Sequence, residues 1–154
     1  YLGDIAKWWR ENISEDWFGI RNEAYGILQR EDTLKEIVKL LGPDALPDEE
    51  KLILEIARMV KIGLLQQNSF DDVDTYCSPE KQFKLLKLVV DFYKLGQQSL
   101  KEGAPLASIR ELPVVTSLLK ARMDIKDDEM PKLDQLEIDM KEQFKNISGV
   151  KVKN

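Results

Sequence analysis

Hydrophobic residues recur every three or four positions along most of this chain. That spacing places them on one face of an α-helix, and no stretch shows the strict alternation of a half-buried strand. The pattern predicts a short helix near residues 4–9, followed by helices over about 14–41, 47–65, 79–101, 106–111, 113–123 and 131–147. The sequence therefore predicts an all-α fold.

Proline, glycine and short polar residues mark where several of these helices begin and end. Ser14 is a suitable cap for the first long helix, whose pattern allows a break near residues 30–33. Gly42-Pro43 should end it, because glycine accepts a positive φ and proline cannot continue a helix. Pro47 and Ser78-Pro79 are typical of helix starts, where the missing N–H of proline costs nothing.

The helix over residues 79–101 has apolar side chains around most of its circumference. A helix of this kind is buried on several sides, so we expect it to lie at the centre of the fold. The predicted architecture is a helical bundle with a long central helix, formed by residues 1–147. Residues 148–154 are expected to form a frayed tail.

Composition narrows the class of partner. The chain is 43% hydrophobic and 33% charged, as in a soluble globular protein, and carries a formal net charge of −5. This acidity argues against nucleic acid or an anionic membrane as the main partner, and favours a basic protein. The single cysteine, Cys77, cannot form an internal disulfide, which indicates a reducing compartment.

Several kinds of chemistry are excluded within this chain. It has no histidine, so it can form neither a Ser-His-Asp or Cys-His catalytic group nor the usual zinc sites. It also lacks the Gly-x4-Gly-Lys-Ser/Thr loop that holds a triphosphate with backbone amides and a lysine. We therefore assign it no catalytic residue and no metal ligand.

An acidic group, formed by Asp44, Asp48, Glu49 and Glu50, surrounds the predicted turn between the first two long helices. The simpler interpretation is that these carboxylates complement the dipole at a helix start, which is worth about 0.3–1 kcal/mol per residue. The functional interpretation is a projecting acidic tip that contacts a basic partner. The residues alone favour the simpler interpretation.

Phe70 follows a polar stretch that includes Gln66 and Gln67. A lone aromatic residue in such a loop most often anchors the loop on the core. It could instead stack on a flat ligand while the nearby amides bind the ligand's edge.

The segment Asp72-Val73-Asp74-Thr75 matches the short motif of aspartyl phosphotransferases. That chemistry requires the aspartates at the end of a buried parallel strand, and this chain has none in its pattern. Aspartates that cap a loop are the favoured interpretation.

Longer phrases carry more information than these short motifs. Trp17 is followed by RNEAYGILQRE, then by IVKLLGPDALPDEEKLILEIARM, LLQQNSF and VDTYCSPEKQFKLLKLVVDFY. In this order the phrases resemble the C-terminal helical domain of the catalytic A subunit of archaeal A-type and vacuolar V-type rotary ATPases. The resemblance covers about residues 8–95, and the remaining helices fit the same domain.

The resemblance implies a role for each end of the helix that follows the acidic turn. The related F-type beta subunit has an acidic loop after a Leu-Gly step, then a helix that leads to Gln-Pro-Phe. By analogy the central stalk would contact residues of the turn: Asp44, Ala45, Leu46, Pro47, Asp48, Glu49 and Glu50. Phe70, with Gln66 and Gln67 near it, would contact adenine in the full subunit. Here Asp71-Asp72 follows Phe70 where the family often has His-Pro, so the contact beyond the adenine stays open.

The implied function is to couple ATP hydrolysis or synthesis to rotation of the central stalk in a proton- or sodium-translocating ATPase. The parent subunit would use ATP or ADP and Mg, whereas this fragment would hold no cofactor and show no activity alone. The implied partners are the central-stalk subunits and the non-catalytic B subunit, without nucleic acid or direct membrane insertion. The expected location is cytoplasmic, peripheral to the membrane in the ATPase head.

Two further hypotheses concern the extent of the protein. The chain starts at Tyr1 rather than methionine, and we expect it to be a piece of a longer subunit. The alternative is a free-standing helical adaptor that binds a basic protein through its acidic loop.

Overall fold

The computed structural model describes residues 7, 16–62, 79–125 and 127–152. Within these ranges every regular element is helical, which confirms the predicted all-α fold. The elements, in chain order, are α2 (Asp16–Leu41), η1 (Pro43–Ala45), α3 (Asp48–Val60), α4 (Pro79–Lys101), α5 (Leu106–Arg110), α6 (Pro113–Asp124), η4 (Asp127–Glu129) and α7 (Pro131–Val152).

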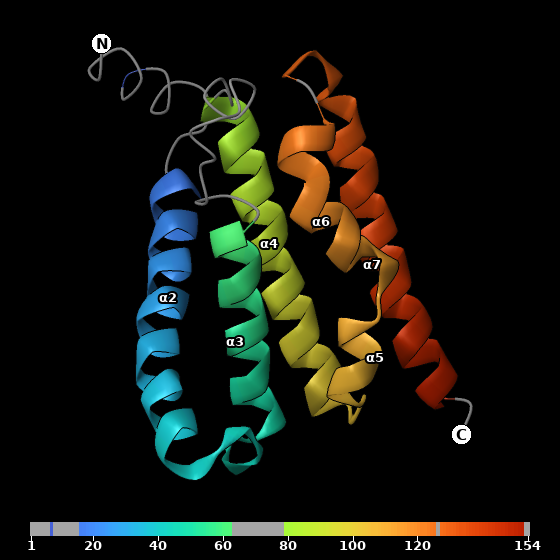
Figure 1. Ribbon diagram of the computed structural model, residues 1–154. Helices are drawn as coiled ribbons and strands as arrows, with labels where there is room; N and C mark the ends of the chain where they lie inside the picture. The colour runs from blue at the N-terminus through green and yellow to red at the C-terminus, as the bar shows by residue number, and fades with distance from the viewer. Residues whose placement is uncertain (1–6, 8–15, 63–78, 126, 153–154) are drawn as a thin grey trace.

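Helix α4 occupies the centre of the fold, as its two apolar stripes predict. It packs against α2 and α3 on one side and against α6 and α7 on the other. Figure 1 shows α2 and α3 as an antiparallel hairpin beside α4, with α6 and α7 forming the opposite wall. The bundle with a long central helix is therefore present.

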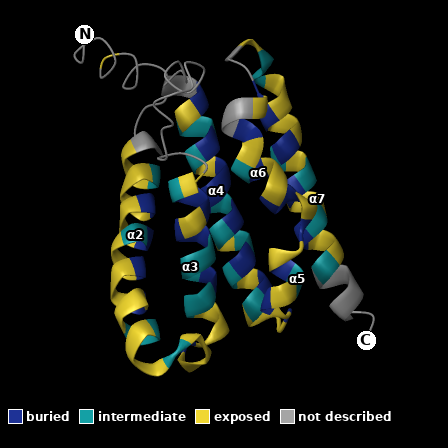
Figure 2. Ribbon diagram, in the orientation of Figure 1, coloured by how far each residue is buried: buried dark blue, intermediate teal, exposed yellow. Residues whose placement is uncertain are grey.

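The core lies where these helices face one another, and buried positions follow the inner faces of the ribbons (Figure 2). Close packing of α3 on α4 depends on Gly96, because a Cβ added there would lie only 3.0 Å from Cδ2 of Leu52. Across the centre, the rings of Phe92 and Phe144 meet edge to face with centroids 5.0 Å apart. Other large side chains that are fully buried include Leu34, Ile56, Met59, Leu85, Ile109, Leu133 and Met140.

One helix start is stabilised by a side chain from a distant helix. The backbone N–H of Val114, in the first turn of α6, donates to Oε1 of Gln143 on α7 at 2.9 Å. This bond satisfies one of the amide groups that a helix start leaves without an intrahelical acceptor. It also joins α6 to α7 in addition to their apolar contacts.

Helix boundaries differ from the sequence prediction in two places. Helix α2 is continuous through residues 30–33, where a break was allowed. No proline or glycine interrupts that segment, and Leu34 just beyond it is almost fully buried, so packing holds the helix together. Helix α7 continues beyond Ser148 to Val152, further than the expected start of the tail. Of the short helix predicted near residues 4–9 only Lys7 is described, and the cap at Ser14 falls outside the described residues.

Candidate functional site

The acidic turn, defined here as residues 42–50, joins α2 to α3 at one end of the hairpin (Figure 1). Gly42 has φ +88° and ψ 163°, a conformation that L residues with a side chain rarely adopt. Its N–H donates to the carbonyl of Val38 at 2.8 Å and closes the last turn of α2. Pro43 then starts the short helix η1, where the N–H of Ala45 donates to the Gly42 carbonyl at 3.2 Å. Backbone hydrogen bonds thus define the shape of the turn.

Leu46 is the buried residue of this turn. Its side chain is only 4% exposed, although charged residues and prolines surround it in the sequence. Five of the seven residues that the resemblance assigns to the stalk contact are exposed: Asp44, Ala45, Pro47, Asp48 and Glu49. The structure therefore places Leu46 inside the molecule, where its side chain supports the turn and is not available to a partner.

Three of the four carboxylates in the acidic turn lie at the start of α3, which explains part of the acidity of the turn. The carbonyl of Pro47 accepts hydrogen bonds from the N–H groups of Glu50 and Lys51, both at 3.0 Å. Asp48, Glu49 and Glu50 fill the first turn, where carboxylates complement the helix dipole. Asp44 lies in η1, before this helix, so the dipole of α3 does not explain it.

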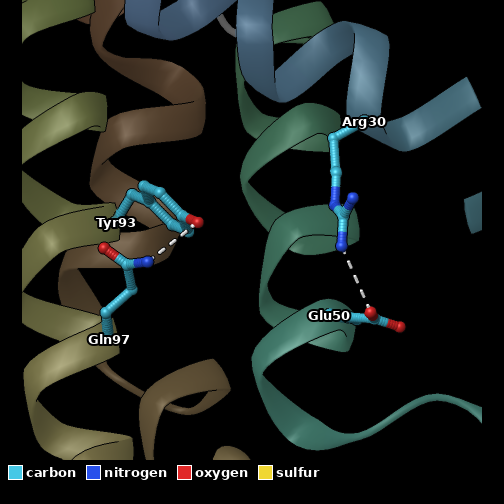
Figure 3. A network of polar contacts seen from close by, with 4 residues as sticks. All are labelled: Arg30, Glu50, Tyr93 and Gln97. Carbon is cyan, nitrogen blue, oxygen red and sulfur yellow. Dashed lines mark hydrogen bonds and ion pairs between the residues drawn. The ribbon is translucent and has the colours of Figure 1, made fainter.

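Glu50 differs from the other carboxylates of the turn. Its Oε1 lies 3.3 Å from Nη2 of Arg30 on α2, and Figure 3 shows this pair bridging the two helices. Nearby on α4, Nε2 of Gln97 donates to the hydroxyl of Tyr93 at 3.0 Å (Figure 3). Burial raises the pKa of Tyr93 above its ordinary value, Arg30 opposes this shift and Glu49 adds to it.

Three carboxylates of the turn keep their full charge exposed. Among the residues that the structure describes, Asp44, Asp48 and Glu49 form no ion pair. Two apolar side chains flank them at the end of α2, since Leu40 is 81% exposed and Leu41 is 72% exposed. The turn thus presents three carboxylates without an ion-pair partner in the described chain, close in sequence to two exposed leucines, and Figure 2 shows this end of the hairpin as mostly exposed.

The structure does not describe the residues that the resemblance assigns to the adenine contact. Gln66, Gln67 and Phe70 lie outside the described residues, and so do Asp72 and Asp74 of the phosphotransferase hypothesis. Within the described ranges, no group of three or more cysteine, aspartate or glutamate side chains could hold a metal ion. No helix of the described chain is both long and apolar enough to cross a membrane.

Two features of the turn did not follow from the sequence pattern. Arg30 lies twenty residues before Glu50, and no local rule pairs residues at that distance. The burial of Leu46 did leave a signal, because a single leucine between charged residues and prolines is a natural anchor for a turn.

Comparisons with known proteins identify the family of this chain. The profile of the family described as "C-terminal domain of V and A type ATP synthase" matches residues 6–110. The A subunit of the A-type ATP synthase from Hyperthermus butylicus is 44% identical over 98% of this chain and 26% of its own length. The corresponding protein of Ignicoccus hospitalis is 43% identical over 96% of this chain and 25% of its own.

A relative with a different name gives the same result. A "V-type ATP synthase alpha chain" from Halothermothrix orenii is 39% identical over 96% of this chain and 25% of its own length. The chain thus spans about a quarter of the length of the curated relatives that it matches. These matches give no support to the free-standing adaptor. The chain belongs to the family of C-terminal domains of V and A type ATP synthases.

Proposed function

We propose that this domain couples nucleotide turnover in its parent subunit to rotation of a central stalk, and that the acidic turn makes the contact. The observation that carries this proposal is the turn itself. It is closed by backbone hydrogen bonds, it projects at the end of a helical hairpin, and it leaves Asp44, Asp48 and Glu49 without an ion pair within the described chain. A surface that transmits force must keep its shape under load. The burial of Leu46 and the Arg30–Glu50 ion pair both favour a single conformation of the turn.

The route of transmission is helix α3. Its first turn belongs to the acidic turn, and its other end leads toward the segment that contains Gln66, Gln67 and Phe70. An α-helix whose buried face packs against α2 and α4 moves as a unit with them. A displacement at the nucleotide end would therefore reach the turn with little loss.

In this proposal ATP or ADP and Mg bind in the parent subunit, and Phe70 contacts the adenine. The partners are the central stalk and the B subunit. The location is the cytoplasmic ATPase head, peripheral to the membrane, and the coupled ion is a proton or sodium. The names of the relatives as parts of ATP synthases support the nucleotide and the assembly.

Site-directed cross-linking in the complete ATP synthase tests the contact. Ala45→Cys is exposed within the turn, and a cysteine-directed photoreactive reagent would be attached to it in a Cys77→Ser background. We expect covalent capture of the central stalk and loss of ATP hydrolysis after illumination. Ile138→Cys on α7, where the native side chain is 57% exposed, is the control and should not capture the stalk. Capture only of subunits other than the stalk from position 45 would refute the proposal.

A further inference from the structure

A second surface lies on the α2–α3 hairpin, away from the turn. It is a groove of about 540 Å³ between the two helices. Helix α2 contributes Glu31, Lys35, Val38 and Lys39, and helix α3 contributes Leu54, Glu55 and Arg58, with Lys61 and Ile62 just beyond its end. None of these residues belongs to the acidic turn, and nothing in the proposed function uses them.

The floor of this groove is apolar. Val38 and Leu54 are half-buried and Ile62 is 44% exposed, so all three keep surface that no other side chain covers fully. Leu54, Arg58 and Ile62 follow one another at steps of four and form a single stripe along α3. The lining spans residues 31–39 on α2 and 54–62 along and just beyond α3, which is eight steps of about 1.5 Å in each case. The groove is therefore about 12 Å long and matches about two turns of a third helix.

The rim of the groove is positively charged on both sides. Side-chain exposure is 52% for Lys35 and 72% for Lys39 on the α2 side. It is 49% for Arg58 and 44% for Lys61 on the α3 side. The two carboxylates that line the groove lie deeper, with exposures of 5% for Glu31 and 26% for Glu55. Each of these four cations pairs with a carboxylate of the chain: Lys35 and Lys61 with Glu31, Lys39 with the exposed Glu36, and Arg58 with Glu55. Each still keeps about half or more of its side chain exposed at the rim.

Glu31 holds the centre of this arrangement. Its Oε2 lies 3.7 Å from Nζ of Lys35, and its Oε1 contacts Nζ of Lys61 across the groove. The hydrogen bond to Glu31 raises the pKa of Lys61 above its ordinary value, which keeps this ammonium group charged. One buried carboxylate therefore positions a cation on each wall, and each cation keeps about half of its surface exposed.

We infer that this groove binds an amphipathic helix of a neighbouring subunit, one whose narrow apolar stripe is bordered by aspartate or glutamate on both sides. The apolar stripe would lie on Val38, Leu54 and Ile62, and the carboxylates would face Lys35 and Lys39 on one side and Arg58 and Lys61 on the other. This is helix-in-groove recognition with charge complementarity along both edges. A groove of this size is too short for a complete stable interface by itself, so we place its partner within a larger assembly. To that extent the inference rests on the proposed function.

Zero-length cross-linking of the unmodified assembly tests the inference directly. A carbodiimide joins a lysine amine to a carboxylate only where the two are in contact, and peptide mass spectrometry identifies the pair. We expect Lys35, Lys39 or Lys61 to be joined to an aspartate or glutamate within a helix of another subunit. Links from these lysines only to carboxylates of their own chain would overturn the inference. Links to the acidic turn of a second copy would overturn it too, because that segment is not the amphipathic helix inferred here.

Charge reversal provides an independent measurement. Lys35→Glu with Lys61→Glu should lower incorporation of the parent subunit into the complex at least about tenfold, because like charges would then face each other across the interface. Lys132→Glu with Lys141→Glu on α7 is the matched control, since both lysines are similarly exposed and each pairs with a glutamate within one helical turn. Equal incorporation of the two double variants would count against the inference. Thermal unfolding of both variants separates this effect from a loss of folding.

These results are distinguishable from those of the stalk experiment. If the reagent at position 45 is cross-linked to the stalk but no groove lysine is joined to a helix of another subunit, only the groove inference fails. If the groove lysines are joined to a neighbouring helix while position 45 never reaches the stalk, the groove stands and the proposed coupling role fails.

Discussion

Nη2 of Arg30 lies 3.3 Å from Oε1 of Glu50 and joins the middle of α2 to the first turn of α3. This pair divides the carboxylates of the acidic turn into two kinds. Glu50 has a partner within the molecule, whereas Asp44, Asp48 and Glu49 form no ion pair within the described chain. The pair therefore joins the turn to α2, and the other three carboxylates stay free for the contact surface that we propose.

Arg30→Met removes the ion pair but keeps the apolar stem of the side chain. Because Arg30 is largely exposed, we expect the free energy of unfolding to fall by no more than about 1 kcal/mol. Urea denaturation of the chain, followed by circular dichroism, measures this change. Lys94→Met, which breaks the Lys94–Glu23 pair between α4 and α2, is a control with an equally exposed cation.

Leu46→Ala should destabilise the protein far more than its place in a surface turn suggests. The side chain is almost fully buried, and truncation of a buried leucine costs about 2–5 kcal/mol. Leu40→Ala is the matched control at an exposed leucine and should change stability by less than about 0.5 kcal/mol. Similar unfolding midpoints for the two variants would show that Leu46 does not anchor the turn.

Neutralising the contact surface should separate association from folding. The triple variant Asp44→Asn, Asp48→Asn, Glu49→Gln should bind the isolated central stalk more weakly, with association that depends less on salt concentration. The cost in stability should stay near the dipole contribution of about 0.3–1 kcal/mol for each residue at the start of α3. Association rates at several ionic strengths measure the effect.

A second triple variant provides the comparison for that experiment. Asp124→Asn, Asp134→Asn and Glu142→Gln remove the same charge from exposed positions on α6 and α7. This variant should retain the salt dependence of the native protein. An identical response of the two triple variants would assign the effect to net charge rather than to the turn.

Asp91 should make stability depend on pH in the direction opposite to that of most aspartates. Burial between α4 and α7 raises the pKa of Asp91; Lys87, Lys94 and Lys141 oppose this shift, and Glu137 adds to it. A raised pKa means that the folded state holds its proton more tightly than the unfolded state. Its contribution to stability is therefore present below the ordinary aspartate pKa of about 4 and is lost as the pH rises through the raised value.

The variant Asp91→Asn tests this pH dependence. Its stability relative to the native protein should increase between pH 4 and pH 7, because asparagine has no proton to lose. Urea denaturation across this range measures the trend, and Glu142→Gln at an exposed position of α7 is the control. A difference between Asp91→Asn and the native protein that does not change with pH would contradict this explanation.

Phe70→Ala tests the nucleotide end of the proposal in the complete parent subunit. Loss of a stacking aromatic ring should weaken binding of ADP or ATP while the domain stays folded. Equilibrium binding of a fluorescent nucleotide analogue measures the affinity, and circular dichroism checks folding. Unchanged nucleotide affinity would remove Phe70 from the adenine contact.

Much of this domain could be predicted from local rules. The stripes on the helix at residues 79–101 predicted its central position, because a helix that is apolar on several faces must be covered on several sides. Gly42-Pro43 predicted the end of α2, and the positive φ of Gly42 confirms the reason. The order of the longer sequence phrases also identified the family, which the matches to its members confirm.

The tertiary structure decided which residues of the turn support it and which face outward. The sequence places Leu46 among the acidic residues of the turn, yet the folded chain buries its side chain. The Arg30–Glu50 pair and the groove around Glu31 both join α2 to α3 across twenty or more residues of sequence. Local rules act over one or two helical turns, so they predict the helices. The pairing of side chains between helices depends on how the helices pack, and only the folded chain determines that.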